Sequence, residues 1–200
     1  MILSNKIQIR QEMLKQRNAL LDSQKLIAQT AAIKRCAEFL TNLLGNKEKL
    51  AGYYPIGSEF NILPLLKQLL NRVEILLPVI QQSPPSTMKF YPWNFSTSMV
   101  ASKYAPSILE PSIQEKEEIP TIIITPLIAC DLYGNRIGSG KAMYDRAIAR
   151  LRKDNPHLLS IALCYDFQVL KKIPTESHDQ QLDIIFTEER EIIRPIFASL

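Results

Sequence analysis

The sequence predicts an α/β fold, a three-layer α/β/α sandwich with a mainly parallel central sheet of Rossmann-like type. Short runs of almost uninterrupted apolar residues recur along the chain, as in VEILLPVI and LSIALCYDF. Such runs are typical of strands that are covered on both faces. Segments of helical character lie between them, and strands that alternate with helices favour parallel pairing. The chain has 200 residues, so we expect a single domain over residues 1–200.

The N-terminal part of the chain is predicted to be helical. A first helix begins at Ser4 or Asn5, both favourable N-cap residues, and runs to about Leu20. A second helix covers about residues 23–44 and is followed by Gly45, the residue type that most often follows a helix end.

The remaining chain supplies the sheet. KLAGYYPIGSEFNILPLLKQLLNR indicates a strand, a turn and a short helix with Pro64 near its first turn. VEILLPVI and MKFYPW predict two strands, and TIIITPLIA, LSIALCYDF and DIIFTEE predict three more. A further helix is expected over AMYDRAIARLRK. The polar, irregular stretch 94–118 is the predicted site of a mobile flap.

Charge and cysteine usage narrow the function classes. A net charge of +4 and a pI near 8.9 suit an anionic small ligand but are too weak to favour nucleic acid. The three cysteines, Cys36, Cys130 and Cys164, stand in apolar surroundings and are expected to be buried, reduced thiols of a cytoplasmic protein. We expect no membrane association, because no apolar run approaches the length of a membrane span and MILSNKIQIR lacks a signal-peptide core.

Three cations fall within the apolar stripe of the first predicted helix. At helical spacing, Lys6, Arg10 and Arg17 lie on one face, flanked by apolar residues such as Ile9 and Met13. Buried charge is costly unless it is paired. These side chains therefore meet acidic residues or face an anion, unless they only snorkel at the rim of a helix interface.

The segment PLIACDLYGNRIGSGKAMYDR is the strongest functional signal. It holds three of the six glycines of the chain, Gly134, Gly138 and Gly140, followed by Lys141. A strand, a glycine-rich turn and a new helix together form an anion cradle, because the helix start offers free N–H groups and partial positive charge. The sequence therefore predicts a phosphorylated ligand here, the alternative being a glycine hairpin that only turns the chain.

Two known phosphate motifs do not match this segment. A P-loop begun at Gly134 would need a glycine at Ser139, and one whose lysine is Lys141 would need a hydroxyl residue at Ala142. A dinucleotide fingerprint begun at Gly138 would need a third glycine at Met143.

Carboxylates accompany the predicted cradle. Ligands of open α/β sheets bind beyond the carboxyl ends of the strands, where the sequence places Glu59 after Tyr54, Asp145 after the glycine loop, and Asp179 before the last predicted strand. Further polar candidates near strand ends are Asp131, Tyr165, Asp166, Gln168, His178, Asp183, Thr187 and Glu188. Singly, each acid fits a cap or a surface charge, but together they favour a hard divalent cation such as Mg²⁺.

These motifs resemble the 5-formyltetrahydrofolate cyclo-ligase family, also called methenyltetrahydrofolate synthetases. GNRIGSGKAMYDR resembles the family signature G-x-R-[IL]-G-x-G-K-G-Y-Y-D-R. In chain order, the other segments that resemble family motifs are KIQIRQEMLKQR, GYYPIGSEFNILPLL, ILEP and IPTESHDQQLDIIFTEE. The resemblance covers nearly the whole chain.

The resemblance implies an ATP- and Mg²⁺-dependent closure of 5-formyltetrahydrofolate to 5,10-methenyltetrahydrofolate through a phosphorylated formyl group, on a substrate that can carry polyglutamate. We expect a monomer, because the sequence shows no obvious association surface. The resemblance also implies catalytic roles for Arg136, Lys141 and Tyr144, and magnesium ligation by Asp145 and Asp179. Folate contacts would come from Tyr54 and Glu59, and from Trp93 as a stacking surface, for which a place in the core is the alternative. The residues implied to bind ATP are Lys6, Arg10, Arg136, Gly138, Ser139, Gly140, Lys141 and Tyr144.

The chain departs from the family signature at one place, where Ala142 and Met143 replace Gly-Tyr. The glycine would suit a positive φ or a close phosphate approach, and the tyrosine would supply a hydroxyl and an aromatic face. The main alternative is therefore an impaired paralogue that binds nucleotide or folate without turnover. Two further alternatives are an interaction protein on an inherited fold and another α/β enzyme that acts on a phosphosugar or an acyl-CoA.

Overall fold

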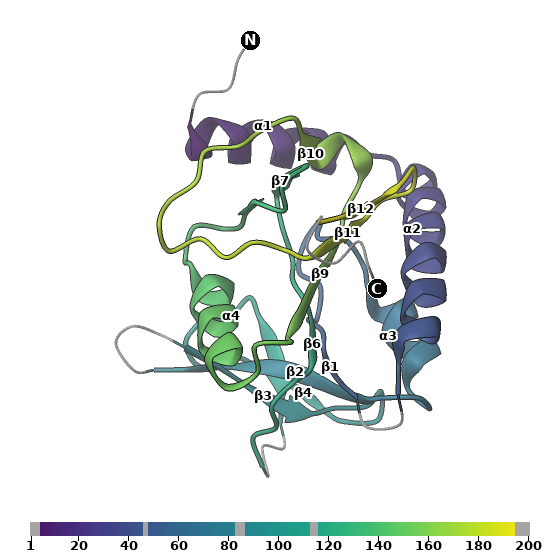
Figure 1. Ribbon diagram of the computed structural model, residues 1–200, viewed down its shortest axis with the longest axis vertical. Coiled ribbons are helices and arrows are strands. Elements are labelled where there is room, and N and C mark those ends of the chain that lie inside the picture. The colour runs from purple at the N-terminus through teal and green to yellow at the C-terminus, as the bar shows by residue number, and fades with distance from the viewer. Residues whose placement is uncertain (1–4, 46–47, 83–86, 113–115, 195–200) are drawn as a thin grey trace.

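A seven-stranded, mostly parallel sheet forms the centre of the protein (Figure 1). The computed structural model describes residues 5–45, 48–82, 87–112 and 116–194. The sheet order is β12-β11-β9-β6-β1-β2-β3, and the inner strands from β11 to β2 all run parallel. The edge strands β12 and β3 pair antiparallel with their neighbours. The predicted α/β fold with a mainly parallel sheet is confirmed.

The strand bounds are close to the predicted apolar runs. The central sheet contains β1 (Lys49–Ala51), β2 (Glu74–Gln81), β3 (Thr87–Pro92), β6 (Ile122–Ile124), β9 (Leu159–Leu163), β11 (Ile184–Phe186) and β12 (Glu191–Ile193). A second sheet has the order β10-β7-β8 and contains β7 (Ala129–Asp131), β8 (Arg136–Ile137) and β10 (Val169–Leu170). A third pairing joins β4 (Met99–Ala101) to β5 (Leu109–Pro111).

Two predictions for these segments differ from the structure. TIIITPLIA is not one strand, because β6 ends before Thr125 and the chain enters the second sheet at β7. Pro126 has no N–H to continue the ladder, which accounts for the break. The stretch 94–118 is not wholly irregular, since it contains β4 and β5, and buried Glu110 accepts a hydrogen bond from the backbone N–H of Ile80 at 2.7 Å.

Helices α2 (Asp22–Leu43) and α3 (Leu63–Leu69) lie on one side of the central sheet, and α4 (Met143–Asp154) lies on the other (Figure 1). Helix α1 (Lys6–Ala19) crosses one end of the molecule beside the small sheet. Asn5 caps α1, because its Oδ1 accepts hydrogen bonds from the N–H groups of Ile7 and Gln8. The predicted cap at Ser4 lies outside the described residues.

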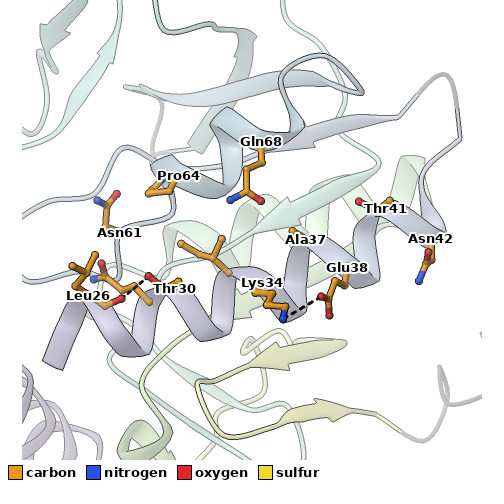
Figure 2. Close-up of a pocket in the computed structure, with 12 residues that line it drawn as sticks. Leu26, Thr30, Lys34, Ala37, Glu38, Thr41, Asn42, Asn61, Pro64 and Gln68 are labelled. Atoms are coloured by element: carbon orange, nitrogen blue, oxygen red, sulfur yellow. Dashed lines mark hydrogen bonds and ion pairs between the residues drawn. The ribbon is translucent and has the colours of Figure 1, made fainter. Parts of the chain in front are cut away.

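A groove of about 570 Å³ lies between helices α2 and α3, on their outer side (Figure 2). Its walls mix short and amide side chains with one exposed ion pair between Lys34 and Glu38. None of the predicted site residues lines this groove.

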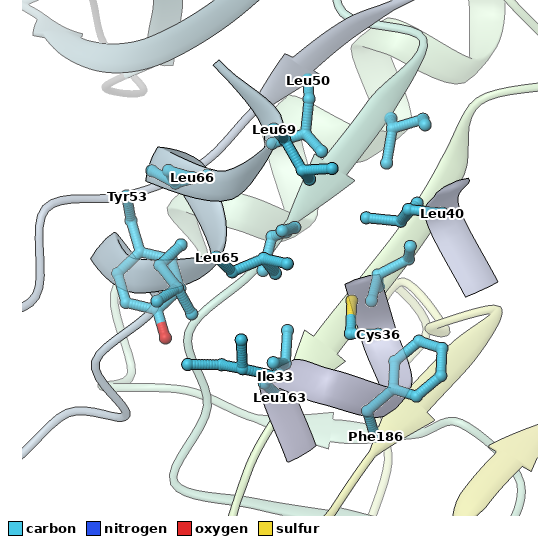
Figure 3. Packing of buried hydrophobic residues seen from close by; sticks show 14 of the residues in the cluster. Ile33, Cys36, Leu40, Leu50, Tyr53, Leu65, Leu66, Leu69, Leu163 and Phe186 are labelled. Atoms are coloured by element: carbon cyan, nitrogen blue, oxygen red, sulfur yellow. The ribbon is translucent and has the colours of Figure 1, made fainter. Parts of the chain in front are cut away.

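The main hydrophobic core lies between the sheet and the helices α2 and α3 (Figure 3). Its fully buried members come from both helices and from the inner strands, and they include Ile33, Cys36, Leu40, Leu50, Leu65, Leu66, Leu163 and Phe186. A second cluster packs α4 onto the opposite face of the sheet, and a third packs α1 onto β7 and β8. The three cysteines are buried and free, as expected. In the part of the chain that the structure describes, no helix is long and apolar enough to cross a membrane.

The turn between β7 and β8 depends on glycine. Gly134 has φ +82°, and a Cβ at this position would lie 2.3 Å from the backbone oxygen of Leu182. Asp131, one of the sequence candidates, stabilises this turn by accepting hydrogen bonds from the N–H groups of Tyr133 and Asn135.

We expect Gly134→Ala to lower the free energy of unfolding by about 2–4 kcal/mol, because it combines a left-handed backbone with an overlap against backbone. Gly57→Ala is the matched control, since Gly57 also has a positive φ, +55°, but a Cβ there meets nothing within 4 Å. Its cost should be only about 1 kcal/mol. Urea unfolding of both variants measures the difference, and equal losses would contradict the steric argument.

Candidate active site

A cleft of about 740 Å³ opens beyond the carboxyl ends of β1 and β6. Its walls come from α1, the segment after β1, the start of β5, the glycine loop with the start of α4, and the segment 176–179. The lining brings together most of the predicted site residues, namely Lys6, Arg10, Tyr54, Glu59, Arg136, Gly138, Ser139, Gly140, Lys141, Tyr144, Asp145 and Asp179. The position agrees with the rule that open α/β sheets bind ligands at this edge.

The glycine loop folds tightly against α1. Arg10 Nε donates a hydrogen bond of 2.7 Å to the carbonyl oxygen of Gly138. Gly140 has φ +96°, and a Cβ there would lie 3.5 Å from the Arg10 guanidinium. A Cβ at Gly138 would lie 2.8 Å from Arg136 Nη1. Glycine therefore suits the left-handed backbone at Gly140, and a side chain at Gly138 would displace the Arg136 guanidinium. The loop passes close to both guanidinium groups, which line the cleft.

A buried ion pair joins the loop to α4. Arg136 Nη2 lies 2.9 Å from Asp145 Oδ1, and the same oxygen accepts a hydrogen bond from the N–H of Gln180. The Arg136 guanidinium also lies 5.8 Å from the centre of the Tyr144 ring, within cation–π range. Arg136 Nε is buried and has no hydrogen-bond partner within the described chain. This donor leaves Arg136 able to bind one more acceptor.

Lys6 meets acidic residues, one of the outcomes expected for the cations of the first helix. Its Nζ lies 2.7 Å from Asp179 Oδ2 and 3.0 Å from Glu176 Oε1. Burial alone would lower the pKa of Lys6, but hydrogen bonds and charge from these carboxylates raise it above the usual value. Burial likewise opposes ionisation of Asp179, whereas Lys6 and the Glu176 N–H bring its pKa below the usual value. Both groups are therefore charged at neutral pH.

The other end of the cleft is apolar and contains the half-buried carboxyl group of Glu59. Glu59 accepts a hydrogen bond from the Ile56 N–H at 3.1 Å, and burial raises its pKa despite this bond and the nearby charge of Arg17. Burial also raises the pKa of Tyr53 and of Tyr144, helped by the charge of Glu59. Both phenols are therefore neutral hydrogen-bonding groups.

Asp145 and Asp179 could supply only some of the ligands of a divalent cation. Asp145 uses Oδ1 for Arg136 and Gln180, and Asp179 uses Oδ2 for Lys6 and the Glu176 N–H. No group of three or more acidic, histidine or cysteine side chains is arranged to hold a metal within the described ranges. This donor set fits Mg²⁺, which is commonly bound through one or two carboxylates together with substrate phosphates and water.

Several sequence candidates lie away from the cleft. Trp93 is buried in the main core, packs on Phe95, and has an indole N–H without a hydrogen-bond partner among the described residues. Asp183 pairs with Arg152 and Arg194, and Asp166 pairs with Arg190. Tyr165, Gln168, Thr187 and Glu188 do not line the cleft either. These residues stabilise the fold around the strand ends.

Sequence reasoning missed the apolar wall of the cleft. It comes from β2, β3, the start of β5 and the segment after β6, and consists of Pro78, Ile80, Met88, Ile108, Leu109, Leu127 and Ile128. Nothing in their local pattern distinguishes these residues from core residues of strands. Glu176 was also missed, although its place beside His178 and Asp179 in an acidic segment was a usable signal.

The fold and the cleft define an α/β protein with a glycine-rich loop and several cationic side chains at the carboxyl edge of its sheet. The family model of the 5-formyltetrahydrofolate cyclo-ligase family matches residues 2–188, and the chain belongs to this family. It is 26% identical over 148 residues to the 5-formyltetrahydrofolate cyclo-ligase of Escherichia coli, covering 70% of this chain and 78% of that protein. It is 28% identical over 163 residues to that of Haemophilus influenzae, covering 78% and 85%.

Solved structures agree with the assignment. The 5,10-methenyltetrahydrofolate synthetase of Aquifex aeolicus superposes with a TM-score of 0.77 at 25% identity, covering 98% of this chain and 95% of that one. The corresponding protein of Mycoplasma pneumoniae gives a TM-score of 0.71 at 20% identity, covering 92% and 98%, and supports the fold.

The departure from the family signature coincides with backbone strain. Ala142 has φ +49° and ψ +25° immediately before α4, and it is the one non-glycine residue with a positive φ in the described chain. We expect Ala142→Gly to raise the free energy of unfolding by about 1 kcal/mol, because glycine adopts this conformation without steric cost. Ala149→Gly, inside α4, is the control and should lower it by about 1 kcal/mol. A lower free energy of unfolding in both variants, measured with urea, would contradict backbone strain at Ala142.

Glu59 should cost the protein stability at neutral pH. Because the folded pKa of Glu59 lies above its unfolded value, the contribution of Glu59 to stability is largest below about pH 4.5 and is lost as the pH rises through the folded pKa. We expect Glu59→Gln to raise the free energy of unfolding at pH 7 and to have little effect near pH 4. Denaturation curves across this range test the sign, and a variant that is less stable at pH 7 would contradict it.

Proposed function

We propose that the protein catalyses the ATP- and Mg²⁺-dependent cyclisation of 5-formyltetrahydrofolate to 5,10-methenyltetrahydrofolate, with release of ADP and phosphate. The observation that carries this proposal is the two-ended cleft, in which a cationic glycine loop adjoins an apolar compartment with the half-buried carboxyl group of Glu59. A phosphate donor and a flat, largely apolar acceptor ring would fit these two ends. Membership of the cyclo-ligase family supports the same pair of substrates.

The cationic end would bind the triphosphate of ATP. Arg10 and Arg136 bring two guanidinium groups to the loop, and Lys6 adds an ammonium group beside them. The segment Gly138–Gly140 permits a close approach of phosphate to backbone, and α4 begins directly after the loop. Lys141 is exposed at the cleft, where its side chain is free to move onto a bound phosphate. Tyr144 and Ser139 would add hydroxyl groups.

The apolar end would bind the folate. Glu59 would accept hydrogen bonds from N–H groups of the pterin ring, and Tyr54 would contact the ring from the same segment. The apolar wall from β2, β3 and β5 would cover the remaining ring surface. Trp93 was expected to stack on the folate, but its place in the core leaves this contact without support.

The chemistry would be a phosphoryl transfer followed by ring closure. The formyl oxygen attacks the γ-phosphate of ATP and gives a phosphorylated intermediate, and a second folate nitrogen then closes on the formyl carbon as phosphate leaves. Arg136 and Lys141 would stabilise the negative charge that develops on the transferred group. Asp145 and Asp179 would hold Mg²⁺, which neutralises phosphate charge when bound. Tyr144, kept neutral by burial, could donate a hydrogen bond.

A binding-only paralogue is the second candidate function. The observation that favours it is Ala142, which holds a strained left-handed conformation where the family has glycine, next to Met143, which lacks the family hydroxyl. Such a protein would retain ATP or folate binding through the other cleft residues. The proposal that the protein is a cyclo-ligase also includes a monomeric state and a folate substrate that can carry polyglutamate.

The test is the growth of methenyltetrahydrofolate absorbance after protein is mixed with 5-formyltetrahydrofolate, ATP and Mg²⁺. We expect growth that requires ATP and falls at least about 100-fold in Lys141→Ala, because the variant loses transition-state charge stabilisation. Lys153→Ala, an exposed lysine at the end of α4, is the matched control and should retain the wild-type rate. No growth from protein that still binds ATP or folate by calorimetry would favour the binding-only paralogue.

A further inference from the structure

We propose that Arg17 is a positioning residue for the folate end of the cleft, where it fixes the segment that carries Glu59 and presents a positive charge to that carboxyl group. The inference rests on the proposed function. Arg17 is the third cation of the α1 stripe, and neither the phosphate-binding loop nor the acidic segment 176–179 accounts for it.

The contacts of Arg17 join three parts of the chain. Its side chain projects from α1 and is only 5% exposed. Nε donates a hydrogen bond of 3.1 Å to Ser58 Oγ, in the segment after β1, and Nη1 donates one of 3.0 Å to the carbonyl oxygen of Leu127, after β6. A planar guanidinium can make both bonds at once, whereas an ammonium group has no such fork. Arg17 therefore links α1 to Ser58, the residue next to Glu59, and to Leu127 in the wall of the cleft.

Arg17 acts on Glu59 through charge and not through a direct ion pair. Its two described hydrogen bonds go to Ser58 and Leu127, and Glu59 Oε2 accepts from the Ile56 N–H. The carboxyl group thus keeps acceptor capacity for a ligand. Burial lowers the pKa of the Arg17 guanidinium while Glu59 opposes this, and the charge of Arg17 in turn lowers the pKa of Glu59 against its own burial.

The other titratable groups that face Glu59 do not supply this positive charge. Tyr53, from the segment after β1, is buried and Tyr144, from α4, is partly buried; burial raises the pKa of both phenols, so they stay neutral. The Arg136 guanidinium lies 5.8 Å from the centre of the Tyr144 ring and pairs with Asp145. Without Arg17, Glu59 would therefore hold its proton to a higher pH. A protonated carboxyl group is a poorer acceptor for ring N–H donors than a carboxylate.

The experiment measures the dissociation constant of 5-formyltetrahydrofolate by calorimetry as a function of pH, for wild-type protein and Arg17→Met. We expect the variant to bind more weakly than wild type at acidic pH, by up to about tenfold where Glu59 is largely protonated, and to approach wild-type affinity towards pH 8.5, since a shift of one pKa unit changes the ionised fraction by up to tenfold. Lys15→Met is the matched control, because it removes an exposed charge from the other face of α1 and should leave the profile unchanged.

Two further variants separate charge from packing. Arg17→Lys keeps the charge but not the fork, so we expect the wild-type pH midpoint with a loss of affinity that is the same at every pH. In a Glu59→Gln background, Arg17→Met should lose its pH dependence, because the group on which it acts no longer titrates. ATP binding, measured in parallel, reports on the fold of each variant and should not change.

A loss of affinity in Arg17→Met that is equal at every pH, or that persists with its pH dependence in the Glu59→Gln background, would overturn the proposal. An unchanged dissociation constant in Arg17→Met would do the same. Each of these results leaves the proposed function standing, because wild-type protein still binds the substrate. Wild-type protein that binds no 5-formyltetrahydrofolate at any pH would overturn the proposed function and, with it, this inference.

Discussion

The buried ion pair between Arg136 and Asp145 is the interaction on which the rest of the site depends. Arg136 belongs to the small sheet and Asp145 to the start of α4, so the ion pair links these two elements. Asp145 also accepts a hydrogen bond from the Gln180 N–H, which links them to the segment that follows β10. Breaking a buried pair by removing one partner leaves an uncompensated charge, so each of these segments is held in place by the same two side chains. The glycine loop lies between them, and its path past Arg10 is fixed as a result.

Helix α1 shows how stability and function compete in this protein. Its apolar residues Ile9 and Met13 pack it onto the small sheet, while three cations on the same face reach the cleft or its walls. The three cations are satisfied in different ways. Lys6 meets two carboxylates, Arg10 a loop carbonyl, and Arg17 a hydroxyl and a carbonyl, all from distant parts of the chain. A purely apolar face would pack α1 with less desolvation, but it would remove three of the cations that line the cleft and leave Arg136 and Lys141 to supply its positive charge.

Ala142 connects the departure from the family signature to a physical consequence. The backbone before α4 keeps a left-handed conformation, although alanine has replaced the residue type that adopts it freely. The surrounding contacts of Arg136, Asp145 and the loop therefore impose the conformation on the chain. The substitution therefore bears on stability and on how a ligand would meet the loop.

The sequence by itself determined the fold class, the glycine loop and the set of charged residues around it, because apolar periodicity and glycine spacing are local properties. It also marked Lys6, Arg10 and Arg17 as unusual, since a charge inside an apolar stripe is visible from spacing alone. Only the tertiary structure decided how each cation is satisfied, that Trp93 lies in the core, that TIIITPLIA divides between two sheets, and that apolar residues such as Ile80 and Ile108 form a wall of the cleft. Those outcomes depend on contacts between residues far apart in the chain, and the local pattern of an apolar strand is the same whether it faces the core or a ligand.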